Sequence, residues 1–77
     1  MMVVVLSSVG AAGTHMRSKP SYTANILATE PAGAVLRVTE DNLADARAHI
    51  GKKNEWIQVR DSQGRRGYVM AISVALQ

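Results

Sequence analysis

The chain has 77 residues, a net charge of +3 and no cysteine. That length suits one domain, and without cysteine neither a disulfide bond nor a thiolate metal site can stabilise it, so apolar packing has to do so. The small positive charge by itself indicates neither a nucleic acid nor a membrane as partner.

The first half of the sequence predicts short strands separated by turns. Extended segments are expected at residues 3–6, 14–17, 24–29 and 34–39, with Ile26 as a core residue of the third. Pro20 and Gly33 stand in the turns between them. Residues 34–39 alternate most clearly between apolar and polar positions, which is typical of a half-buried strand.

A helical segment is expected near 42–50. Asp41 or Asn42 can cap it, the alanines that follow favour a helix, and Gly51 can end it. We expect one to two turns packed on the rim of the fold, followed by a solvated loop.

The last hairpin permits a prediction of register. Gly64 is placed to adopt a left-handed conformation and to close a three-residue loop, Ser62–Gly64. Trp56 is then opposite Met70, and a single face carries only apolar or very small residues: Ile57, Val59, Gly67 and Val69. A two-residue loop would set Ile57 opposite Tyr68 and mix the faces, so the three-residue loop is favoured.

Residues 71–76 are expected to form a short helical turn and a last strand. The fold class predicted from these elements is all-β: a small barrel, rather than a sandwich, of five to six short strands with a short helical insert near 42–50.

Catalysis finds little support in the sequence. His15 and His49 are far apart, and no serine stands in a nucleophile-elbow pattern. The glycines match neither a P-loop nor a dinucleotide fingerprint. We therefore expect no enzyme activity, no cofactor and no metal site.

A binding surface is expected on the outward face of the last hairpin. Its candidate residues are Trp56, Gln58, Tyr68 and Met70, bordered by Tyr22 from the first loop. A tryptophan and a tyrosine side by side outside the core form a shallow apolar shelf with polar tips, a common recognition surface. The alternative is that Trp56 covers the end of the protein's own core, and both interpretations stay open.

Basic residues form a second group. Arg17 is expected to support the first loop by bonding carbonyl groups or a carboxylate. The residues expected at one end of the hairpin are Lys52, Lys53, Arg60, Arg65 and Arg66. A solvated rim is the simpler interpretation of this set, and an anion-attracting patch is the alternative.

Two segments resemble the opening and closing signatures of the bacterial SH3 domain. They are Gly13-Thr14-His15-Met16-Arg17-Ser18-Lys19-Pro20-Ser21 and the stretch from Trp56-Ile57-Gln58-Val59-Arg60 to Gly67-Tyr68-Val69. The positions expected to shape the fold are Arg17, Pro20, Gly33, Gly64 and Gly67. The chain departs from the family pattern at Thr14, His15 and Lys19 and in the helical insert.

The resemblance implies that the barrel is SH3-like and that it forms a single domain over residues 3–76, with residues 1–2 outside it. It implies a non-catalytic targeting module, often attached to cell-wall hydrolases or other envelope proteins, that recognises peptidoglycan or a peptide. One alternative is an accessory domain that packs on a neighbouring domain of the same chain or on a second copy. Nucleic-acid binding is the weakest alternative. Neither a signal peptide nor a membrane span is recognised in the sequence, so an extracellular or envelope location would follow from a longer secreted parent protein.

Overall fold

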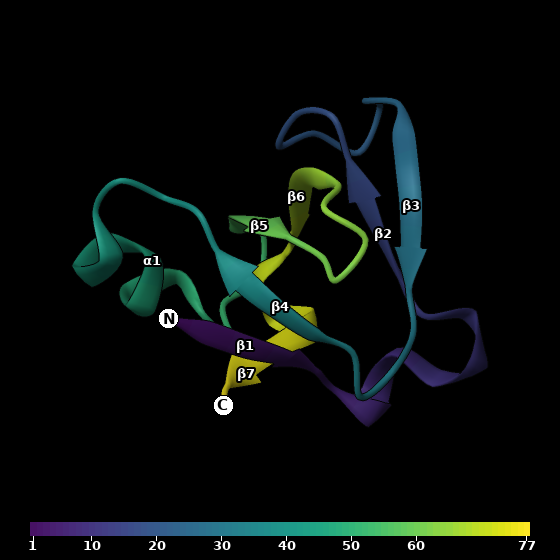
Figure 1. Ribbon diagram of the computed structural model, residues 1–77, viewed down its shortest axis with the longest axis horizontal. Helices are drawn as coiled ribbons and strands as arrows, with labels where there is room; N and C mark the ends of the chain where they lie inside the picture. The colour runs from purple at the N-terminus through teal and green to yellow at the C-terminus, as the bar shows by residue number, and fades with distance from the viewer.

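A computed structural model describes residues 1–77 as one antiparallel sheet with a single short α-helix (Figure 1). In chain order its elements are β1 (Met2–Val5), the 3-10 segment η1 (Ser7–Ala12), β2 (Thr14–Arg17), β3 (Ile26–Glu30), β4 (Val35–Val38), α1 (Leu43–His49), β5 (Trp56–Arg60), β6 (Arg66–Met70), the 3-10 turn η2 (Ala71–Ser73) and β7 (Val74–Leu76).

The sheet has seven strands in the order β3-β2-β6-β5-β4-β1-β7. It curls, so that β3 runs in a different direction from β1 in Figure 1, but its edge strands β3 and β7 do not pair with each other. The predicted all-β, SH3-like fold with a helical insert is confirmed. The sheet has seven strands rather than the five to six expected, and β7 pairs with β1 at one edge. The sheet stays open, because β3 forms the other edge and pairs only with β2.

β1 begins at Met2, and the Met1 carbonyl accepts a hydrogen bond of 2.8 Å from the amide of Val38. The first two residues are therefore part of the folded unit.

The core lies on the inner face of the curled sheet. Its side chains alternate along the strands, as a period of two requires, and its fully buried members are Val3, Val5, Met16, Leu36, Ile57, Val59, Val69 and Val74. The expected inward placement of Ile57, Val59 and Val69 is confirmed.

The expectation that Ile26 belongs to the core is wrong, because its side chain is 51% exposed. A bulge between Met16 and Arg17 shifts the pairing of β2 with β3. Met16 is opposite Ala28, but after the bulge Arg17 is opposite Ile26. The shift therefore places Ile26 beside an outward-facing neighbour at the edge of the sheet.

The pairing of β2 with β6 depends on a residue without a side chain. A Cβ atom at Gly67 would lie 2.5 Å from Met16 Cγ and 2.7 Å from the Arg17 carbonyl oxygen. Because the Arg17 oxygen belongs to the backbone, it cannot move aside without displacing β2. Gly67 thus lets the two parts of the sheet approach each other around Met16.

α1 begins where the sequence predicts, with Asn42 as the cap. The Asn42 side-chain oxygen accepts a hydrogen bond of 3.1 Å from the amide of Asp45. Ala46 is the one buried residue of the helix, so only a narrow strip of α1 packs on the sheet. After the helix, Gly51 at φ 84° donates from its amide to the Ala71 carbonyl at 2.8 Å, which ties the insert to η2.

Replacing Gly67 by alanine tests the close approach of β6 to β2. We expect Gly67→Ala to lower the free energy of unfolding by about 1–3 kcal/mol, because the new methyl group must displace backbone. Gly33→Ala is the matched control: Gly33 has φ 86° and open space around its Cβ position, so only backbone strain of about 1 kcal/mol is expected. Urea denaturation measures both values, and an unchanged Gly67→Ala midpoint would contradict the packing described here.

Candidate ligand-binding face

The hairpin of β5 and β6 has the predicted register. Trp56 is opposite Met70, Gln58 is opposite Tyr68, and Arg60 is opposite Arg66. Gly64 has φ 82°, and the Asp61 amide donates to the Arg65 carbonyl at 2.9 Å, so the three-residue loop is confirmed.

The Asp61 carboxylate holds this loop together. It is 5% exposed and accepts hydrogen bonds from the amides of Gln63 at 3.0 Å and Arg65 at 2.9 Å. It also accepts one from the Arg65 guanidinium at 2.7 Å. Burial by itself would raise the pKa of Asp61, but hydrogen bonds with Glu30, Arg65 and these amides outweigh it and lower the pKa to about 2.

A second carboxyl group, on Glu30 at the end of β3, lies buried beside Asp61. Glu30 is 4% exposed, and its Oε2 atom has no hydrogen-bond partner. Burial raises the pKa of Glu30 to about 7, helped by the hydrogen bond to Asp61 and the negative charge there and opposed by Arg65. The two carboxyl groups connect the β2–β3 hairpin to the β5–β6 loop.

The predicted binding residues lie on the outward face of this hairpin. The half-buried members are Trp56, Gln58, Tyr68 and Met70. Tyr22, in the loop between β2 and β3, is 57% exposed and sits edge-on to Trp56, with ring centroids 5.1 Å apart and an interplanar angle of 65°. The aromatic ring in contact with Trp56 is therefore that of Tyr22, which comes from a distant part of the chain.

The loop that carries Tyr22 is held by local hydrogen bonds. The Arg17 guanidinium donates to the Ala24 carbonyl at 3.0 Å, and the Ser18 amide donates to the Asn25 carbonyl at 2.9 Å. Tyr22 lies between these anchored ends, while Pro20 is exposed nearby. Arg17 thus supports the loop that brings Tyr22 to Trp56.

Two shallow hollows are lined by parts of the Tyr22 loop and by Met70. On the side of the Tyr22 loop lies a polar hollow of about 300 Å³, lined by Ser18, Lys19, Ser21, Thr23, Ala24 and Asn25. On the side of Met70 lies a more apolar hollow of about 370 Å³, lined in part by Val9 and Ile72.

The expected cluster of basic residues is only partly correct. Arg60, Arg65 and Arg66 lie at the loop end of the hairpin, but Lys52 and Lys53 precede β5 and lie at its other end. Arg37 takes their place, because β4 pairs with β5 and sets Arg37 opposite Arg60. The alternation in residues 34–39 already indicated that Arg37 faces outward, but the partner of β4 could not be read from the sequence.

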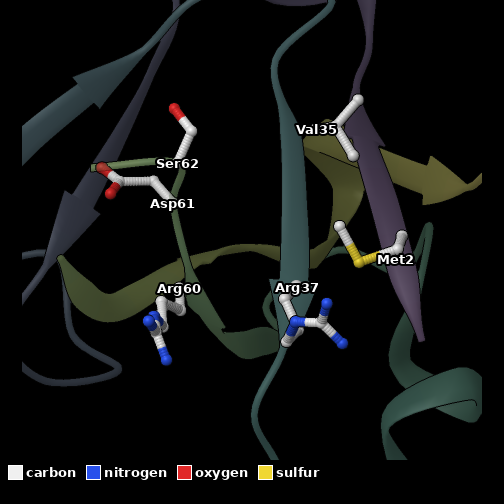
Figure 2. Close-up of a pocket in the computed structure, with 6 residues that line it drawn as sticks. All are labelled: Met2, Val35, Arg37, Arg60, Asp61 and Ser62. Atoms are coloured by element: carbon white, nitrogen blue, oxygen red, sulfur yellow. The ribbon is translucent and has the colours of Figure 1, made fainter. Parts of the chain in front are cut away.

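A hollow of about 570 Å³ opens beside these arginines (Figure 2). It is lined by Met2, Val35, Arg37, Arg60, Asp61 and Ser62.

The structure brings together no group of three histidine, aspartate or glutamate side chains able to hold a metal ion. The Nε2 atom of His49 is 3.9 Å from a carboxylate oxygen of Glu55, and both side chains are partly exposed. None of the helices has the length and apolar character needed to span a membrane.

Comparison with known proteins gives one match. A model of the bacterial SH3 domain family matches residues 12–73. The chain matches no curated protein and no solved structure. The matched range runs from the end of η1 to the end of η2 and includes the aromatic pair and the whole β5–β6 hairpin.

The buried carboxyl pair predicts an unusual dependence of stability on pH. Glu30 has a folded pKa of about 7 against an ordinary 4.5, so its contribution is full below 4.5 and is lost as pH rises through 7. Asp61 has a folded pKa of about 2 against 3.8, so its contribution is present above 3.8 and is lost as pH falls through 2. The free energy of unfolding should be greatest between about pH 4 and 5 and decline by about 1–3 kcal/mol toward pH 8.

Glu30→Gln keeps a hydrogen-bond donor beside Asp61 and removes the titration. We expect it to flatten the decline above pH 5 and to unfold at a higher temperature than the wild type near pH 8. Glu55→Gln, at a partly exposed position, should leave the decline in place. Thermal melts followed by circular dichroism measure this, and equal slopes in wild type and Glu30→Gln would refute the assignment.

Proposed function

The chain belongs to the bacterial SH3 domain family, and on this premise we propose that it recognises peptidoglycan or a peptide of the bacterial cell envelope through the Tyr22–Trp56 pair. Domains of this family are in general binding modules rather than enzymes, and they often occur in extracellular or envelope proteins.

The observation that carries the proposal is the edge-on contact of Tyr22 with Trp56. Two rings inclined at 65° form a corner with two apolar walls, against which a sugar face or a peptide side chain can lie. Tyr22 is mostly exposed, although its loop is anchored at both ends, so a ligand would meet a ring already in place. A fixed ring costs less entropy on binding than a mobile one.

Polar groups are available next to this corner. Gln58 lies two residues along β5 from Trp56 on the same face, and its side-chain amide makes no hydrogen bond within the protein. The phenol of Tyr68, directly across the sheet, is likewise without a protein partner. An apolar corner with free donors and acceptors beside it suits a ligand that combines carbon surface with amide or hydroxyl groups.

The alternative interpretation of Trp56 is that it covers the protein's own core. Its half-buried state shows that part of the ring packs on the fold. Substitution of Tyr22 distinguishes the two interpretations: its ring is exposed and contributes little to the core, so a loss of binding in Tyr22→Ala would point to a ligand site.

A second candidate function is docking on a neighbouring domain or on a second copy. The supporting observation is β3, an edge strand on which Ile26 and Leu27 are both large, apolar and exposed. An unpaired edge of this kind can accept a further strand. Size-exclusion chromatography with light scattering of wild type and Leu27→Lys distinguishes self-association from a monomer.

Retention on purified, insoluble peptidoglycan tests the first proposal. We expect the wild type to be retained and Tyr22→Ala to lose about tenfold in affinity, since aromatic anchors commonly contribute more than 1 kcal/mol. Trp56→Phe should lose less than Trp56→Ala, because it keeps an apolar ring. Leu43→Ala, an exposed apolar residue on α1, is the control and should bind as the wild type does. The proposal would be refuted if the wild type were not retained, or if Tyr22→Ala and Trp56→Ala were retained as well as the wild type.

A further inference from the structure

Three arginines form a row across the centre of the sheet. Arg37 on β4 is directly opposite Arg60 on β5, and Arg60 is directly opposite Arg66 on β6. All three side chains are exposed. Neighbouring strands lie about 4.8 Å apart, so the row places three positive charges on one face over a span of about 10 Å.

No group in the protein neutralises this row. The two ion pairs of the structure join Asp61 to Arg65 and Glu55 to His49. The Asp61 carboxylate, which lines the same hollow as Arg37 and Arg60, is buried and already bound by Arg65 and two amides. None of the three arginines of the row donates a hydrogen bond to the protein through its side chain.

Such an arrangement weakens the fold. Like charges directly opposite each other on a sheet are destabilising, and this row contains two such pairs. An anion that binds between the strands would remove the repulsion, and it would find all the guanidinium donors free.

The surroundings of the row indicate the shape of the ligand. Arg37 and Arg60 extend from neighbouring strands beside the hollow in Figure 2, and Met2 and Val35 line its other side. Ser62 adds a hydroxyl group at the hairpin loop. The lining residues come from β1, β4, β5 and the loop after β5, so a ligand in the hollow would cross from strand to strand.

We propose that this row binds a linear phosphodiester polymer whose repeat carries no aromatic base, a polyol phosphate. Arginine is the preferred side chain for phosphate recognition, because its rigid fork of donors matches the phosphate oxygens, and guanidinium groups on adjacent strands can share the two free oxygens of one phosphodiester. One negative charge per repeat matches a row of single positive charges. The short carbon spacers between phosphates can lie on Met2 and Val35.

The position of the aromatic residues disfavours a nucleic acid. Single-stranded nucleic acid sites interleave basic residues with aromatic stacking platforms. Trp56 lies four residues along β5 from Arg60, about 13 Å away at 3.3 Å per residue. Only the half-buried Tyr68 is next to the row, diagonally across from Arg60.

This site is separate from the Tyr22–Trp56 pair, so each proposal can fail alone. The test is fluorescence anisotropy with a labelled synthetic poly(glycerol phosphate) of about ten repeats. We expect the wild type to bind, and Arg37→Gln/Arg60→Gln to weaken binding by at least about tenfold, given the strength of charge-assisted hydrogen bonds. The dependence of log affinity on log salt should fall by about one to two for the same double variant.

Lys52→Gln/Lys53→Gln is the matched control, because it removes the same charge at the other end of β5. It should change the affinity less than about threefold, and Tyr22→Ala should leave it unchanged. All three arginines are exposed, so these variants should fold, and Arg60→Gln should melt no lower than the wild type because a repulsion is removed.

Four outcomes would overturn the proposal. The first is no wild-type binding, and the second is an equal loss in the arginine and lysine double variants, which would indicate charge alone. The third is equal or tighter binding of oligo-dT of matched charge, which would indicate a nucleic-acid site. The fourth is equal binding of poly-glutamate, which would indicate a site for acidic peptides.

Discussion

The arrangement of the whole hairpin face depends on the Asp61 carboxylate. It is bound by two amides and a guanidinium of its own loop, which fixes the loop at three residues and thereby sets the register of β5 and β6. Because side chains alternate along a strand, a slip of one residue would turn Ile57 and Val59 outward and bury Trp56 and Arg60. The core, the aromatic pair and the arginine row all require the same register.

The same carboxylate links the parts of the sheet that are far apart in the sequence. Glu30 at the end of β3 is buried next to Asp61, and Gly67 lets β6 approach Met16 of β2. These contacts hold the β2–β3 hairpin against β6, so the loop between β2 and β3 is placed where Tyr22 meets Trp56. The buried carboxyl pair thus helps to set the geometry of the exposed aromatic corner. Its burial lowers the stability of the fold at neutral pH.

Local features of this fold could be predicted from the sequence, and non-local ones could not. The register followed from Gly64 and from the separation of apolar residues, and the helix start followed from the Asn42 cap. The exposure of Ile26 depends on a bulge between β2 and β3, and the burial of Glu30 depends on a loop 31 residues later in the chain. Arg37 and Tyr22 likewise obtain their neighbours from strand pairing and loop packing that no single segment encodes. Lys52 and Lys53 lie at the opposite end of β5 from the predicted one, because they precede the strand.

The register of the β5–β6 hairpin is measured most directly by cross-strand NOEs in the NMR spectrum of the wild-type protein. The account predicts backbone contacts that join Ile57 to Val69 and Gln58 to Tyr68, with the indole ring of Trp56 close to Tyr22. A set of NOEs displaced by one residue, joining Ile57 to Tyr68, would contradict it, because the aromatic and arginine side chains could not then share the outward face.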